Sequence, residues 1–78
     1  MKVTKTPLHL HSIGEKLTVV SLDGSDFFKE KLICQGIIPG AQIEIVNKRT
    51  NGPLVLRINQ TKVIIGSGMT ERIFVTKS

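Results

Sequence analysis

The stretch Lys31-Leu32-Ile33-Cys34-Gln35-Gly36-Ile37-Ile38-Pro39-Gly40 decides the fold, because an apolar helical segment must end within it and a strand must begin directly after it. Gly36 can adopt the left-handed conformation that closes a helix. Pro39 has a fixed φ and no N–H, so it cannot continue one. Pro39-Gly40 suits the central pair of a type II turn, with glycine where φ is positive. The sequence therefore predicts a helix, a tight turn and a strand in succession.

A short helix is predicted to lead into this stretch. Asp23-Gly24-Ser25-Asp26 is a cluster of turn formers, and Ser25 or Asp26 can accept hydrogen bonds from the free N–H groups of a helix start. Phe28 and Leu32 are four residues apart and share one face of this helix. The other faces mix apolar and charged side chains, so the helix is imperfectly amphipathic: Phe27, Lys31 and Cys34 share a neighbouring face, and Lys29, Glu30 and Ile33 fill the remainder.

Short alternating or β-branched segments flank the helix on both sides and predict a mainly β fold. Ile43 and Ile45 should face a core, because they alternate with polar residues that should face water. Residues 48–53 should form a hairpin loop and residues 69–71 a tight turn. The five expected strands are 17–22, 41–45, 54–58, 62–65 and 73–76. Such strands fit a small antiparallel barrel with the helix inserted between the first two, because closure removes exposed strand edges.

The composition fits one folded domain over residues 1–78 with no linker. The chain is 40% hydrophobic and 22% charged, which is too apolar for a disordered chain despite its net charge of +5. The single cysteine cannot form an internal disulfide, so the fold does not depend on an oxidising compartment. We therefore expect a cytoplasmic protein.

Neither an export signal nor a membrane span is expected. The basic N-terminal residues 1–7 are followed by Leu8 and Leu10, but His9, His11 and Ser12 interrupt the apolar segment that a signal peptide requires. A membrane-spanning helix needs about 20 apolar residues, and the sequence has no such run.

The positive charge raises the alternative of a polyanionic partner, RNA or DNA. Lys and Arg are scattered along the chain, and only Lys48 and Arg49 are adjacent. With no Trp or Tyr and only three Phe, the chain also offers little for base stacking. A solvated basic surface is therefore the favoured interpretation, and nucleic-acid binding is kept as the alternative function.

Metal binding and catalysis are not favoured. His9 and His11 would lie on one side of an extended segment, but two ligands are too few for a metal site, and solvated or capping histidines are expected. Cys34 is interpreted as a small buried hydrophobe. The chain shows no nucleophile motif, no phosphate-binding glycine loop and no paired acids, so we expect no enzyme, no cofactor and no small-molecule substrate.

Several of these segments together resemble a known family. They are Gly14-Glu15 before a strand, Lys31-Leu32 followed by Gly36 and Pro39-Gly40, two alternating strands across a Gly/Pro loop, and Ile73-Phe74-Val75 near the end. This pattern resembles FeoA, ferrous iron transport protein A, over nearly the whole chain. The residues that match the family signature are Leu32, Gly36, Pro39 and Gly40.

The resemblance implies an SH3-like barrel that acts in the cytosol beside FeoB, the membrane protein that moves ferrous iron and carries a GTPase domain. The same module occurs at the C-terminus of metal-dependent repressors, whose DNA-binding helices are absent here. The leading hypothesis is a non-enzymatic adaptor that docks on FeoB and modulates its GTPase or transport cycle. A metal chaperone is a weaker alternative. Weak self-association through an edge of the barrel is a further alternative.

The inserted helix offers the first candidate contact for such a partner. Consecutive helical residues point about 100° apart, so one of Phe27 and Phe28 should stay partly exposed unless both rings wrap around the end of the barrel. An exposed ring would join Ile37 or Ile38 as an apolar anchor. Two lysines, Lys29 and Lys31, would rim this anchor.

The loop over residues 48–53 offers a second candidate contact. Arg49 and Asn51 could supply polar contacts from it, since loops often carry binding residues. A solvated hairpin is the alternative.

Overall fold

The computed structural model describes residues 5–49 and 52–77, apart from the side chain of Ser67. In these residues the chain forms six strands, one α-helix of nine residues, one short helical turn and one 3₁₀ helix. In chain order they are β1 (Thr6–Pro7), η1 (Leu8–Leu10), β2 (Lys16–Leu22), α1 (Asp26–Cys34), β3 (Gln42–Lys48), β4 (Leu54–Ile58), β5 (Thr61–Ile65), α2 (Ser67–Thr70) and β6 (Ile73–Lys77).

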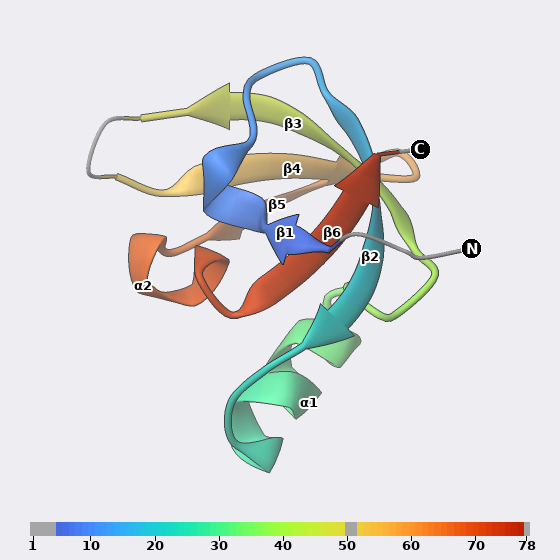
Figure 1. Cartoon of the computed structure of the whole chain (residues 1–78), viewed down its shortest axis with the longest axis vertical. Helices are drawn as coiled ribbons and strands as arrows, with labels where there is room; N and C mark the ends of the chain where they lie inside the picture. Colours follow the sequence, from blue (N-terminus) through green and yellow to red (C-terminus); the bar gives the residue numbers. More distant parts are fainter. Residues whose placement is uncertain (1–4, 50–51, 78) are drawn as a thin grey trace.

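The strands form one antiparallel sheet in the order β1-β6-β2-β3-β4-β5, which is strongly curved (Figure 1). The register shifts between Val19 and Ser21 in β2 and between Ile45 and Asn47 in β3. Such bulges bend a strand and increase its twist. Helix α1 connects β2 to β3 and lies at one end of the molecule. The predicted mainly β fold, with a helix between the first two long strands, is confirmed.

The core lies inside the curved sheet and is built mainly from strand residues that alternate inward, together with Leu8 of η1, Leu32 of α1 and Ile37 after α1. As predicted, Ile43 and Ile45 are buried while Gln42 and Glu44 remain accessible to water. Burial of a Val, Leu or Ile side chain contributes about 1.5–3 kcal/mol, so this cluster is the main source of stability. Its members are Leu8, Leu17, Val19, Leu32, Ile37, Ile43, Ile45, Leu54, Leu56, Ile58, Val63, Ile65, Ile73 and Val75.

The beginning of α1 and its end follow the sequence signals. Ser25 is the N-cap, and its Oγ accepts a hydrogen bond from the N–H of Phe28 at 3.3 Å. At the other end Gly36 has φ +91°, its N–H donates to the carbonyl of Ile33, and the N–H of Ile37 donates to the carbonyl of Leu32, both at 3.0 Å. This pair of bonds is the Schellman motif, which satisfies the last free carbonyls of a helix.

The predicted type II turn follows directly. The N–H of Ala41 donates to the carbonyl of Ile38 at 2.9 Å, and Gly40 has φ +93°. The turn is joined to β2 on both sides, because Gly40 donates to the carbonyl of Val19 at 2.7 Å and Val19 donates to that of Ala41 at 2.9 Å. The turn therefore fixes where α1 stands relative to the sheet.

Replacing Gly36 with alanine is expected to destabilise the protein by about 1–2 kcal/mol, the cost of a left-handed conformation for a residue with a Cβ. The added Cβ would lie 3.7 Å from Ile58 Cγ2, an ordinary contact, so the cost comes from the backbone. Urea unfolding followed by circular dichroism measures it. The control is Gly66→Ala, where φ is −62° and no described atom lies within 4 Å of the new Cβ. Equal midpoints for the two variants would contradict the prediction.

Several elements differ from the predictions. Strand β1 and η1 are not among the predicted elements, because a two-residue strand shows no alternation in the sequence. Pro7 is tolerated in β1 because this strand lies at the edge of the sheet. Strand β3 continues past its predicted end at Ile45, because the bulge interrupts the alternation while pairing with β4 goes on to Lys48. The predicted tight turn over 69–71 is present, since the N–H of Arg72 donates to the carbonyl of Met69 at 3.1 Å, and the single helical turn α2 begins two residues before it.

Candidate protein-docking surface

A stripe of side chains on α1 faces away from the sheet. Phe27, Glu30, Lys31 and Cys34 occupy positions i, i+3, i+4 and i+7, which places them on one face. These four residues, called the helix surface below, line a shallow groove of about 380 Å³. Phe27 is 76% exposed, which is unusual for a large aromatic side chain. Helix α1, which carries this surface, lies at one end of the molecule (Figure 1).

The helix presents this surface because it is held by its opposite side. Of the nine residues of α1, all of which the structure describes, Leu32 alone is buried. Phe28 is half-buried, packs against the core, and has the guanidinium of Arg72 5.9 Å from its ring centroid. Of the two alternatives for the phenylalanine pair, the structure therefore supports the exposed ring, which is Phe27.

Ile37 is not an exposed anchor, contrary to prediction. Its side chain is 0% exposed and belongs to the core cluster, whereas Ile38 is 43% exposed. The reason is the helix end: Ile37 follows the left-handed Gly36, and an apolar residue at this position of a Schellman motif turns back toward the helix. Ile38 and Lys31 are exposed as expected, and Lys29 is half-buried.

The prediction that Cys34 is buried is wrong. Its side chain is exposed and lines the groove of the helix surface. Cys34 lies two residues after the buried Leu32, about 200° around the helix, so only one of the two can face the sheet. Ile33 is also exposed, and it adds apolar area that the sequence analysis did not select. The sequence did contain a signal for this exposure, because Ile33 does not lie on the helix face that Phe28 and Leu32 share.

The second candidate contact is only partly described. Arg49 is exposed at the end of β3, and Asn51 lies outside the described residues. The N–H of Gly52 donates to the carbonyl of Arg49 at 3.1 Å, as a tight connection requires. No further support for a contact comes from this loop.

His9 and His11 lie in the segment before β2, which makes several contacts within the fold. His9 lies within η1, so His9 and His11 do not share one extended segment. Lys48 Nζ donates to the carbonyls of His9 and His11, both at 2.7 Å, and ties this segment to β3. His11 Nε2 lies 2.7 Å from Thr6 Oγ1, and its Nδ1 lies 3.3 Å from Glu15 Oε1. Within residues 5–49 and 52–77 no group of three or more His, Cys, Asp or Glu could hold a metal ion.

The carboxylate of Glu15 completes this arrangement. It accepts a hydrogen bond from the backbone N–H of Ser12, and this bond, followed by the one with His11, holds the pKa of Glu15 below its ordinary value. The charged form of Glu15 thus fixes the loop before β2.

Among the helices of the described residues, none has the length and apolar character needed to cross a membrane.

The fold and the exposed helix define a small SH3-like β domain with one inserted helix. The family model described as the FeoA domain matches residues 6–77, and the chain belongs to the FeoA family.

Two similar proteins support the assignment, and a third shares the fold alone. A protein of Methanocaldococcus jannaschii named "Putative Fe(2+) transport protein A" is 26% identical over 69 residues, which cover 88% of this chain and 83% of that one. The crystal structure of the iron uptake regulatory protein FeoA has a TM-score of 0.90 at 29% identity, covering 96% and 100% of the two chains. A manganese-dependent transcriptional repressor has a TM-score of 0.90 at 18% identity, covering all of this chain and 44% of the repressor.

Proposed function

We propose that this protein is a cytoplasmic, non-enzymatic accessory protein of ferrous iron transport that docks on FeoB, the membrane transporter with a GTPase domain, through the helix surface. Membership of the FeoA family and the similarity to the Methanocaldococcus jannaschii protein named "Putative Fe(2+) transport protein A" support the link to ferrous iron transport. The observation that carries the docking proposal is the 76% exposure of Phe27 on a helix whose opposite side is fixed to the core.

The chemistry of the helix surface suits a protein contact. An exposed aromatic ring is typical of the few interface residues that carry most binding energy, and full burial of a phenylalanine against a partner contributes about 1.5–3 kcal/mol. Ile33 on the same helix and Ile38 beyond its end are also exposed, while Glu30 and Lys31 line the groove together with the ring. Charges at the rim of an interface orient a partner more than they add affinity.

Replacing Phe27 with aspartate is expected to weaken binding to the cytosolic domain of FeoB by at least about tenfold, since it removes the anchor and adds an unpaired charge to the contact. The fold should be retained, because the ring is mostly exposed. Isothermal titration calorimetry with the purified domain measures the affinity, and circular dichroism checks the fold.

A matched control is Leu10→Asp, which introduces the same charge at an exposed apolar residue of η1, away from α1. This variant should bind as the wild type does. Wild-type affinity in folded Phe27→Asp protein would exclude the helix surface as the docking site. Loss of binding in both variants would point instead to a general charge effect.

A further inference from the structure

A row of charged side chains crosses the outer face of the sheet, away from the helix surface. The register places Lys16 of β2 opposite Glu44 of β3, Glu44 opposite Arg57 of β4, and Arg57 opposite Lys62 of β5. Residues directly opposite on one face have Cβ atoms about 4.5–5.5 Å apart. These four residues, called the basic row below, contain three cations and one carboxylate, and they come from four separate segments of the chain.

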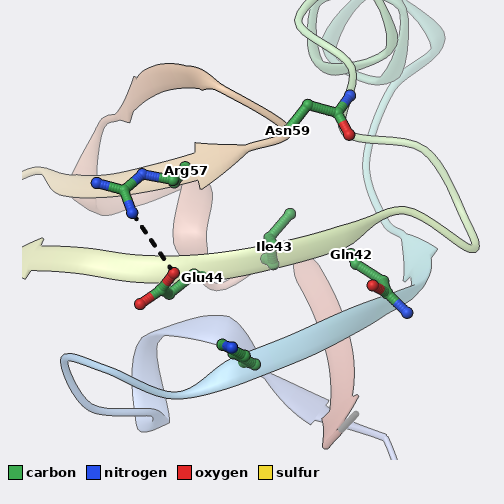
Figure 2. A pocket seen from close by; sticks show the side chains of 6 residues that line it. Gln42, Ile43, Glu44, Arg57 and Asn59 are labelled. Carbon is green, nitrogen blue, oxygen red and sulfur yellow. Dashed lines mark ion pairs between the residues drawn. The ribbon is translucent and has the colours of Figure 1, made fainter.

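The single carboxylate leaves this row positively charged. Glu44 and Arg57 reach toward each other from neighbouring strands (Figure 2), with 3.8 Å between Oε1 and Nη1, which is longer than a hydrogen bond. Arg57 also lies opposite Lys62, and like charges in opposite positions destabilise a sheet. An anionic group placed over Arg57 and Lys62 would relieve this repulsion.

Arg57 lines a shallow pocket with residues of β2 and β3, whereas Lys62 lies opposite Arg57 on β5. Gln42 and Asn59 line a shallow pocket of about 280 Å³ together with Lys16, Glu44 and Arg57 (Figure 2). The planar guanidinium of Arg57 has further donors that the long contact with Glu44 does not use.

An apolar pair lies beside the basic row on the same face. Val55 of β4 is opposite Ile64 of β5, each two residues from Arg57 and Lys62 respectively, and side chains two apart in a strand share a face. Ile64 is 67% exposed. The outer face of β4 and β5 therefore offers a cationic position and an apolar position at the spacing of an extended chain.

Strand β5 also ends the sheet. It pairs with β4 on one side, so its alternate N–H and C=O groups on the other side face away from the sheet. An extended peptide can add to such an edge, with its backbone providing affinity and its alternate side chains providing specificity. The side chains it would meet are Lys62 and Ile64.

We propose that the edge of β5 binds an extended segment of a partner protein in which acidic and apolar side chains alternate. An acidic side chain of the segment lies beside Lys62 and Arg57, and the apolar side chain two residues away lies beside Ile64. A nucleic acid would leave the apolar pair Val55 and Ile64 without a partner. None of the side chains at this site, Arg57, Lys62, Val55 and Ile64, is aromatic, so the site offers nothing for base stacking. A second copy fits less well because each copy carries a net charge of +5.

The test uses a capped octapeptide of four Glu-Val repeats, titrated into the ¹⁵N-labelled protein at low salt. Binding is expected to shift the amide resonances of Thr61–Ile65 and to weaken when NaCl is raised from 0.05 to 0.5 M, because exposed charge pairs are screened. The double variant Arg57→Gln, Lys62→Gln should bind about tenfold more weakly, since it removes both charges that face the acid. An octapeptide of Lys-Val repeats should not bind.

The matched control is Lys29→Gln, Lys77→Gln, which removes two charges from α1 and β6. It should bind the Glu-Val peptide as the wild type does, and so should Phe27→Asp, because the helix surface is a separate site. The proposal is overturned by an absence of shifts in β5 at millimolar peptide, by equal losses in the two double variants, or by equal binding of the Lys-Val peptide. Tighter binding of a decathymidylate to the same amides would also overturn it, in favour of a nucleic-acid surface.

Discussion

Replacing Ile37 with aspartate is expected to prevent the protein from folding at 25 °C. The side chain is 0% exposed within the core, and it follows the glycine that closes α1. Removing a buried isoleucine costs about 2–5 kcal/mol, and an unpaired carboxylate in its place adds a desolvation cost of several kcal/mol. A domain of this size has about 4–12 kcal/mol of stability. The far-ultraviolet circular dichroism and the dispersion of the amide resonances should both be lost.

The neighbouring position provides the control. Ile38→Asp introduces the same charge one residue further along, where the side chain is 43% exposed, and it should leave the spectra native. A folded Ile37→Asp protein would contradict the burial of this side chain. The comparison also matters for binding studies, because a loss of partner binding in Ile37→Asp would report unfolding and not the loss of a contact.

Replacing Leu32 with alanine is expected to lower the free energy of unfolding by about 2–5 kcal/mol. Leu32 is 1% exposed and is the side chain through which α1 is buried in the core. The variant should therefore loosen α1 more than the sheet. Urea unfolding measures the total loss, and hydrogen exchange of the α1 amides compared with those of β3 and β4 measures its distribution.

Ile33→Ala is the matched control, since it shortens the adjacent aliphatic side chain at an exposed position. Surface substitutions usually change stability by less than about 0.5 kcal/mol. If Leu32→Ala and Ile33→Ala had the same unfolding midpoint, the burial of Leu32 would not be what holds the helix. A loosened α1 should also weaken docking on FeoB if the helix surface makes that contact, because the anchor would no longer be held in place.

The helix surface and the edge of β5 are built from different elements, α1 on one side and β4 with β5 on the other. Their side chains also differ, since the helix surface is centred on an aromatic ring and the edge on two cations beside an apolar pair. The two proposals can therefore fail independently. Phe27→Asp tests the first and leaves the second unchanged, while Arg57→Gln with Lys62→Gln does the reverse.

The sequence alone determined the local backbone of this protein. Ser25, Gly36 and Gly40 act through hydrogen bonds and φ values within a few residues of themselves, so the helix start, its end and the type II turn could be predicted. The alternation of Ile43 and Ile45 with polar neighbours likewise fixed which face of β3 is buried. The resemblance to the FeoA family rests partly on the same helix-end and turn residues, Gly36 and Gly40.

Only the tertiary structure decided which of the apolar residues face the core and which face water. Ile37 and Ile38 are chemically identical and adjacent, yet the path of the chain beyond Gly36 buries the first and exposes the second. Cys34 is exposed although Leu32, two residues before it, is buried, because the side of α1 that packs on the sheet was not known. The basic row was equally hidden, because Lys16, Glu44, Arg57 and Lys62 come together only through the register of four strands. Local signals act over a few residues, whereas burial and cross-strand neighbours depend on pairing between distant parts of the chain.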